Sequence, residues 1–225
     1  MRFLTRSEVR PLFAGRSVAI VGSGPGVLQN PEGLIDSHDI VVRVNNYKLA
    51  QGTGHRTDVF YSFFGTSIRK SAEDLKRDGV SLCMCKCPNA HAIESEWHRS
   101  NNKMIGVDYR PHYERRKAWW FCDTYIPTIE EFMEAFRLLD FHQPTTGFAA
   151  IYDVLSFAPR SIYLTGFDFF ASRLHNVDEP WVEKNHDDPI RHVPEREAQW
   201  LAANMNRYPV TVDAALQARL RKAAA

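Results

Sequence analysis

The fold is decided by the stretch VAIVGSGPGVLQNPEGLIDSHDIVVRVNN, residues 18–46. It begins with an apolar run, residues 18–21, that is typical of a buried parallel strand. A glycine-broken turn, Gly22-Ser23-Gly24-Pro25-Gly26, follows directly, and a short helix or loop leads to a second strand-like run at residues 40–42. Glycine has no Cβ, so such a turn lets backbone N–H groups approach a phosphate. The stretch therefore predicts a parallel sheet with a nucleotide site at the end of its first strand.

The rest of the chain continues this alternation of strands and helices. Strand-like runs are expected at residues 59–64, 80–85, 161–170 and 210–213. Helices are expected at residues 71–79, 129–139, 145–157, 194–201 and 214–225. Ser71 with Asp74 and Thr128 with Glu131 have capping-box spacing at the start of two of these helices. The pattern predicts an α/β fold with a mainly parallel sheet flanked by helices, in a single domain over residues 1–225. A polar stretch near residues 171–193 is expected to be a lid loop.

Composition excludes several classes of function. The chain has 225 residues, 44% of them apolar, and a formal net charge of +1. That charge gives no global field to attract nucleic acid. No apolar run approaches the roughly 18 residues that cross a bilayer, and no export signal precedes the first strand. We expect a cytoplasmic protein with free thiols. The run Cys83-x-Cys85-x-Cys87 is expected to send its middle thiol to the opposite face, which argues against a metal cluster.

Two common nucleotide sites fit the turn poorly. An NAD site has the spacing Gly-x-Gly-x-x-Gly and an acidic residue after the second strand. Here the second strand ends in Arg43-x-Asn45, and no Gly-Lys-Ser/Thr of a P-loop follows the turn. Arg43 and Asn45 leave the same face of their strand, and both suit a nucleotide or a carboxylate. A buried pair of Arg43 with Asp39 or Asp58 is the equal alternative.

Two further segments carry chemistry suited to a phosphate or a sugar. The helix that begins near Thr145, Thr146 and Gly147 offers uncompensated N–H groups and a positive dipole end. Gly166 and Asp168 follow a strand at its carboxyl end, where ligands gather in parallel sheets. For Asp168 we expect a structural or orienting role, since no Asp-x-Asp accompanies it.

The motifs together resemble the sialyltransferases of glycosyltransferase family 29 and, more loosely, the bacterial sialyltransferases of family 42. The large sialylmotif is similar to residues 18–57, and the small sialylmotif is similar to residues 144–167. Motif three resembles His175-Asn176-Val177-Asp178, and the very small motif, His-x4-Glu, is matched by His192 and Glu197. The chain departs from the family at Ser23, where Asn is usual, at Asn176, where an aromatic is usual, and in lacking the disulfide of the animal enzymes.

The resemblance implies a Rossmann-type, GT-A-like fold and an inverting transfer of an acidic sugar from a CMP-sugar donor. It implies no divalent metal and no cofactor. His192 would be the general base and His175 would contact the leaving phosphate. The donor would be held by Gly22, Ser23, Gly24, Arg43, Asn45, Thr146, Gly147, Gly166 and Asp168. An imidazole has an unperturbed pKa near about 6.5, which suits proton removal at neutral pH.

The sequence leaves the donor and the partners open. Both CMP-sialic acid and CMP-Kdo carry a carboxylate beside the anomeric carbon, so a Kdo transferase is the first alternative. A non-catalytic nucleotide-sugar-binding module is the second, and an oxidoreductase is a distant third. The acceptor is expected to be a glycan or a lipid-linked glycan. The basic C-terminal helix permits peripheral membrane contact, and the sequence also permits a homo-oligomer.

Overall fold

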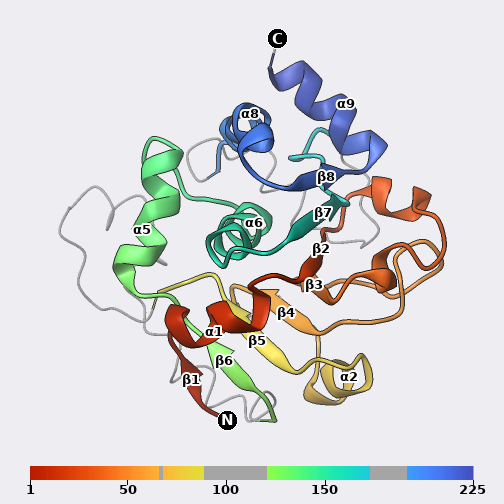
Figure 1. Cartoon of the computed structure of the whole chain (residues 1–225), viewed down its shortest axis with the longest axis vertical. Helices are drawn as coiled ribbons and strands as arrows, with labels where there is room; N and C mark the ends of the chain where they lie inside the picture. Colours follow the sequence, from red (N-terminus) through yellow and green to blue (C-terminus); the bar gives the residue numbers. More distant parts are fainter. Residues whose placement is uncertain (66–67, 89–120, 173–191, 225) are drawn as a thin grey trace.

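The computed structural model describes the whole chain except residues 66–67, 89–120, 173–191 and 225. Within the described residues the strands form one eight-stranded sheet, in the order β1-β6-β5-β4-β3-β2-β7-β8. Every neighbouring pair is parallel. Figure 1 shows the twisted sheet running diagonally across the molecule, with β1 near one end and β8 near the other. The expected α/β fold with a parallel sheet is confirmed.

The strands are short. They are β1 (Phe3–Leu4), β2 (Ser17–Val21), β3 (Ile40–Val44), β4 (Val59–Ser62), β5 (Leu82–Cys85), β6 (Asp123–Tyr125), β7 (Ser161–Thr165) and β8 (Val210–Val212). The α-helices are α1 (Arg6–Phe13), α2 (Ala72–Arg77), α5 (Ile129–Leu138), α6 (Thr146–Ser156), α8 (Pro194–Asn204) and α9 (Ala214–Ala223). The described residues also form three 3-10 helices, η1 (Pro25–Gln29), η2 (Ile35–Ser37) and η3 (Met205–Arg207).

The sequence prediction missed β1, α1 and β6, so the apolar run at residues 18–21 is the second strand and not the first. The predicted strand at residues 161–170 is too long, because β7 ends at Thr165. Gly166, Phe169 and Phe170 have positive φ angles of 73°, 51° and 56°, which an extended strand does not allow. Both expected capping boxes are confirmed, at the start of α2 and of α5.

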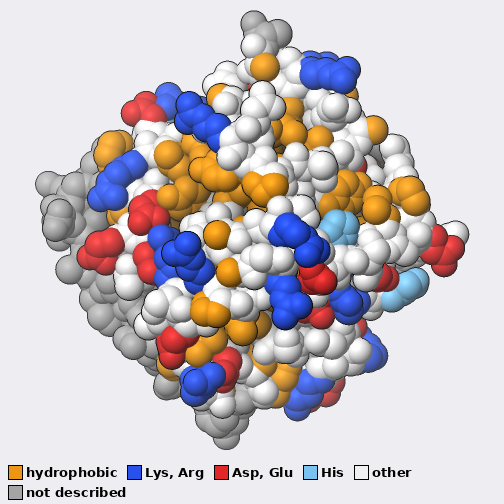
Figure 2. Space-filling model, viewed as in Figure 1, with side chains coloured by type: hydrophobic (Ala, Val, Ile, Leu, Met, Phe, Trp, Pro, Cys, Tyr) orange, Lys and Arg blue, Asp and Glu red, His pale blue; other side chains and the backbone are white. Residues whose placement is uncertain are grey.

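The sheet is buried on both faces, which explains its continuous apolar strands. On one face, α1, α6, α8 and α9 pack over side chains such as Ile20, Val42 and Met84. On the other face, α2 packs beside Phe60 and the cysteines of β5, and Ile35 of η2 covers Ala19 and Val41. Figure 2 shows acidic and basic side chains interspersed over the described surface seen in Figure 1. Neither sign of charge covers this face alone.

The cysteines require a correction. Cys83, Cys85, Cys87 and Cys122 are buried free thiols, and all four belong to one apolar cluster, whereas Met84 packs on the opposite face. The middle cysteine therefore shares a face with its neighbours, because residues two apart on a strand point the same way. The expectation of free thiols is confirmed, but the argument from opposite faces is wrong.

A buried carboxyl beneath the sheet makes stability depend on pH. Tyr61 donates a hydrogen bond of 2.7 Å to Asp153, and the Arg6 guanidinium lies 3.9 Å from the same carboxyl. Burial outweighs both interactions and raises the pKa of Asp153 to about 7. The unfolded chain loses this proton near 3.8, so between these pH values the folded state binds more protons.

We therefore expect this carboxyl to lower the free energy of unfolding as the pH rises from about 4 to about 7. The loss should be on the order of a few kcal/mol. Asp153→Asn keeps an oxygen for Tyr61 and removes the titration, so it should flatten part of this fall. Urea unfolding of the wild type and the variant at pH 4.5 and 7.5 measures this difference in the free energy of unfolding. An equal decrease in both proteins would show that Asp153 does not cause it.

Candidate active site at the carboxyl edge of the sheet

The candidate site lies where the order of strands reverses. From β2 the chain adds β3, β4, β5 and β6 on one side of the sheet, and β7 and β8 pair on the other side. In open parallel sheets, ligands bind beyond the carboxyl ends of the strands at such a switch point. The helices α6 and α8 precede the parallel strands β7 and β8, so their N-termini lie at this same edge. Most of the predicted site residues lie along this edge.

The glycines of the first turn pack against the turn after β7. A Cβ on Gly22 would lie 2.3 Å from the carbonyl oxygen of Gly166, and one on Gly24 would lie 2.8 Å from it. The N–H of Gly22 donates to Thr165 and that of Gly24 donates to Gly166. These glycines therefore allow two backbone turns to meet, and their N–H groups are already used. Gly22, Gly24 and Gly166 therefore form the floor of the site. The first turn was expected to bind phosphate through such N–H groups, and in the structure these donate to the end of β7 and the turn after it instead.

The start of α6 presents N–H groups to the site. Thr145 is the N-cap, and its hydroxyl oxygen accepts the N–H of Phe148 at 3.1 Å. Among the described residues, the N–H groups of Thr146 and Gly147 have no acceptor. Gly147 also allows the Phe167 ring to pack closely, since a Cβ there would lie 2.8 Å from the ring. The structure thus joins the two predicted segments, the α6 start and the turn after β7, through Phe167.

Glu197 fixes the position of the α6 start. This glutamate is fully buried, and its carboxylate accepts the backbone N–H of Thr145 at 2.6 Å and its hydroxyl at 2.7 Å. Burial raises the pKa of Glu197 to about 7, although the hydrogen bonds from Thr145 and the charge of Lys86 act in the opposite direction. The glutamate of the His-x4-Glu pattern therefore acts from α8 on the N-terminus of α6.

His192 precedes α8 and is oriented by a backbone carbonyl. Its Nδ1 lies 2.9 Å from the carbonyl oxygen of Gln143. A carbonyl only accepts, so Nδ1 carries the proton and Nε2 is the basic nitrogen of the neutral ring. His192 and Glu197 both contact the segment 143–145, at the start of α6. The structure therefore brings the candidate base and the candidate phosphate-binding helix start together.

Asn45 follows β3 in a left-handed conformation. Its φ angle is 52°, a region that Asn tolerates better than most residues. Its side-chain oxygen accepts from the Ser62 hydroxyl at 3.2 Å, and its N–H donates to Tyr61. The oxygen is thus held by β4, and the amide NH2 has no acceptor among the described residues. Non-glycine residues held at positive φ often occur at ligand sites.

Arg43 lies one residue before the end of β3, and its side chain is buried inside the protein. The side chain is fully buried, with Nε donating to the carbonyl of Arg56 at 3.0 Å and Nη2 to that of Thr53 at 2.6 Å. Burial lowers the pKa of Arg43 to about 10. The buried alternative is the better description, but its partners are two carbonyls and not the predicted aspartates. Arg43 holds the loop before β4, and we do not place it in the donor site.

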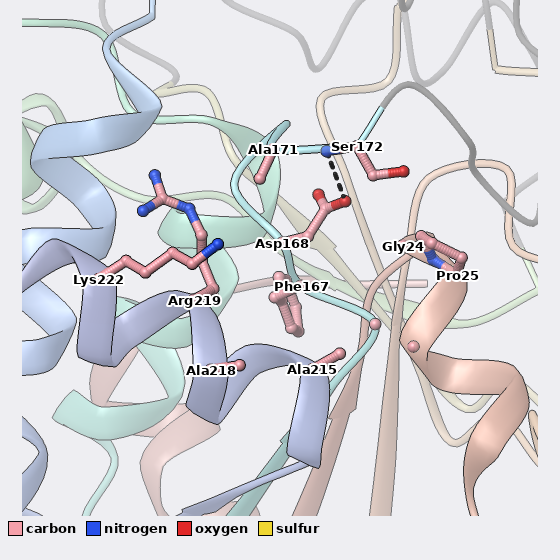
Figure 3. Close-up of a pocket in the computed structure, with 12 residues that line it drawn as sticks. Gly24, Pro25, Phe167, Asp168, Ala171, Ser172, Ala215, Ala218, Arg219 and Lys222 are labelled. Carbon is pink, nitrogen blue, oxygen red and sulfur yellow. Dashed lines mark hydrogen bonds between the residues drawn. The ribbon is translucent and has the colours of Figure 1, made fainter.

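Asp168 orders its own turn, as expected of a structural or orienting residue. Its carboxylate accepts the N–H of Phe170 at 3.0 Å and that of Ser172 at 3.1 Å. Figure 3 shows the bond with Ser172. Asp168 also lines a cavity of about 350 Å³ together with Gly24 and Gly166. Arg219 and Lys222 of α9 lie on the far side of this space. We call it the α9 cavity.

Two positioning residues escaped the sequence analysis. Asp213 caps α9 through Leu216 and also accepts the Thr165 hydroxyl and the Gly166 N–H, so it holds the turn after β7. Its place before a helix and after a short strand could have identified the cap. Gln143 supplies a backbone carbonyl, which no side-chain pattern reveals. Its own amide oxygen is buried without a partner among the described residues.

Some expectations fall outside the described part of the chain. His175, His186 and nearly all of the predicted lid loop lie within residues 173–191. Ser23 is half-buried in the first turn, where no described residue forms a hydrogen bond with its hydroxyl. In the described ranges, no group of three or more His, Cys, Asp or Glu side chains is arranged to hold a metal ion. None of the helices in these ranges is long and apolar enough to cross a bilayer.

The geometry defines an α/β protein whose sheet edge carries a helix N-terminus, an oriented histidine and a left-handed asparagine. No family model matches the chain, and no curated protein matches it. Solved structures do match. A mammalian sialyltransferase is 16% identical over a match that covers 90% of this chain and 70% of that chain, with a TM-score of 0.51.

Bacterial structures agree with this result. The sialyltransferase CstII from Campylobacter jejuni, in complex with the substrate analogue CMP-3FNeuAc, is 16% identical. The match covers 88% of this chain and 80% of that chain, with a TM-score of 0.54. Another mammalian structure, in complex with Gal-beta-1-3GalNAc-ortho-nitrophenol, has a TM-score of 0.54 at 18% identity, over 90% of this chain and 71% of that chain. The chain therefore has the GT-A-like fold of the sialyltransferases, as its motifs predicted.

Proposed function

We propose that the protein is an inverting glycosyltransferase that moves an acidic sugar from a CMP-sugar donor to a glycan hydroxyl. The observation that carries the proposal is the hydrogen bond from His192 Nδ1 to the Gln143 carbonyl, beside the N-terminus of α6. With Nδ1 protonated, Nε2 is the basic nitrogen of the ring, and the ring is held beside a helix start suited to phosphate. The CMP complexes of CstII support the nucleotide, as does the common fold.

In this proposal each residue has one task. His192 Nε2 takes the proton of the acceptor hydroxyl while that oxygen forms a bond to the anomeric carbon. The bond from this carbon to the CMP phosphate breaks, and its electron pair leaves with CMP. The N–H groups of Thr146 and Gly147 and the positive end of α6 stabilise the phosphate charge. Asn45 binds the cytidine nucleotide through its amide NH2, and His175 contacts the leaving phosphate.

No divalent metal takes part in the proposed mechanism. The N-terminus of α6 and the imidazole of His175 already stabilise the negative charge on the leaving phosphate. Asp168 does not act as a metal ligand here, since its oxygens order the turn that contains it. Turnover is therefore expected to persist in EDTA. A requirement for a divalent cation would overturn this part of the proposal.

CMP release tests the proposal. The protein is incubated separately with CMP-Neu5Ac and CMP-Kdo, each with and without a panel of glycan acceptors. We expect CMP release from one donor, stimulated by an acceptor, and the responding donor then distinguishes a sialyltransferase from a Kdo transferase. CMP binding without release from either donor would instead support a nucleotide-sugar-binding module.

A further inference from the structure

The α9 cavity is formed by three segments that are distant in sequence. They are the turn after β2, the turn after β7 and one face of α9. Its volume of about 350 Å³ lies within the range of small-molecule sites. Figure 3 shows the three segments facing one another around this space, with Phe167 between them. A ligand of the size of a sugar unit is therefore compatible with the cavity.

The cavity combines an apolar lining with separate charged walls. The apolar part consists of Pro25, Phe167, Ala171, Ala215 and Ala218. Aromatic rings and small apolar side chains suit the C–H face of a sugar. The Asp168 carboxylate and the Ser172 hydroxyl stand on the wall opposite α9, and both groups can accept a hydrogen bond from a sugar hydroxyl.

The wall formed by α9 is positively charged. Lys222 is exposed and makes no ion pair with a described carboxylate, and Figure 3 shows its nitrogen turned towards Phe167 and Asp168. Arg219 pairs through Nη2 with Glu195, while its Nε is buried without a hydrogen-bond acceptor among the described residues. Two cationic side chains on one wall of the cavity favour an anionic group.

We propose that the α9 cavity binds an acidic sugar unit of the acceptor glycan, with its carboxylate or phosphate held by Lys222 and Arg219. The inference rests on the proposed function, because it assigns a class of acceptor to a space beside the donor turn. Arg219 pairs with Glu195, which lies three residues after His192, so this ion pair links one wall of the cavity to the segment of the candidate base. Gly24, Pro25 and Gly26 of the first turn line one side of the cavity, so the acceptor unit would lie directly beside the donor turn.

Binding of matched acidic and neutral sugars tests this inference. Saturation-transfer NMR and calorimetry compare 3′-sialyllactose with lactose, and glucose 6-phosphate with glucose, on the full chain. We expect at least one acidic sugar to bind more tightly than its neutral partner. Lys222→Glu should weaken that binding by about tenfold or more, because a charge-assisted hydrogen bond becomes a repulsion. Arg221→Glu makes the same change of charge on the next residue, which does not line the cavity, and should have a smaller effect.

The outcomes separate this inference from the proposed function. CMP is titrated into the wild type and both variants. If CMP binds but Lys222→Glu and Arg221→Glu affect the acidic sugar equally, the cavity assignment is overturned and the CMP site stands. If CMP binds but acidic and neutral sugars bind equally tightly, or no sugar binds, the cavity assignment is likewise overturned and the CMP site stands. If the wild type binds acidic sugar through Lys222 but does not bind CMP, the cavity is supported and the proposed function fails.

Discussion

His192→Ala is expected to lower sugar transfer by at least about a hundredfold while leaving CMP binding nearly unchanged. General-base catalysis typically contributes about 10²- to 10⁴-fold to a rate. The Gln143 carbonyl fixes the proton on Nδ1 of His192, so the substitution removes the basic Nε2 of the histidine held at this helix start. Steady-state transfer rates and calorimetric titration with CMP measure the two effects separately.

His38→Ala is the matched control. The Nδ1 of His38 also meets a backbone carbonyl, that of Leu34 at 3.0 Å, and its ring stacks on Tyr163. His38 precedes β3 and so lies at the amino edge of the sheet, away from the candidate site. His38→Ala should leave the transfer rate within about twofold of the wild-type rate. A near-normal transfer rate in His192→Ala would contradict the role of His192 as general base.

Glu197→Ala is expected to destabilise the fold by about 3 kcal/mol and to weaken CMP binding. The substitution leaves the N–H and the hydroxyl of Thr145 without their charged acceptor, and hydrogen bonds to charged groups contribute about 1.5–3 kcal/mol each. The N-terminus of α6 then loses the contact that fixes it at the proposed phosphate site. Urea unfolding and CMP titration at pH 7.5 measure both effects.

Two control variants, Glu195→Ala and Glu197→Gln, show whether the effects of Glu197→Ala come from the loss of its buried hydrogen bonds. Glu195 is half-exposed and pairs with Arg219, so its loss should change stability by less than about 1 kcal/mol. Glu197→Gln keeps one acceptor but cannot titrate. The pKa of Glu197 is raised from 4.5 to about 7, so its titration lowers stability as the pH rises between these values. The Gln variant should lack this contribution. If Glu197→Ala were as stable as Glu195→Ala, the buried contact would have no structural role.

The sequence predicted those parts of the fold that depend on local signals. The apolar run at residues 18–21 and the two capping boxes gave correct strand and helix positions. The strand Asp123–Tyr125 was missed because three residues, one of them charged, show no periodicity. The helix Arg6–Phe13 contains Pro11, which normally argues against a helix interior. These elements depend on contacts with distant segments.

The candidate site was predictable to the same degree. Asn45, Thr146, Gly147 and His192 lie at the expected edge because parallel strands place their carboxyl ends together. The role of Arg43 was not readable, since its burial depends on where the loop at residues 53–56 folds. A glycine needed for contact between two turns also looks the same in sequence as one needed for a phosphate. Only the position of Gly166 distinguishes the two uses of Gly22.

Calorimetric titration of CMP into the wild type and into Asn45→Asp is the most direct test of the central claim, that the carboxyl edge of the sheet is a CMP site. Asp keeps the shape of Asn45 but replaces its NH2 donor with a charge that repels phosphate. We predict that one CMP binds per chain and that Asn45→Asp lowers the affinity by about tenfold or more. Absence of CMP binding to the wild type, or equal affinity in the two proteins, would contradict the claim.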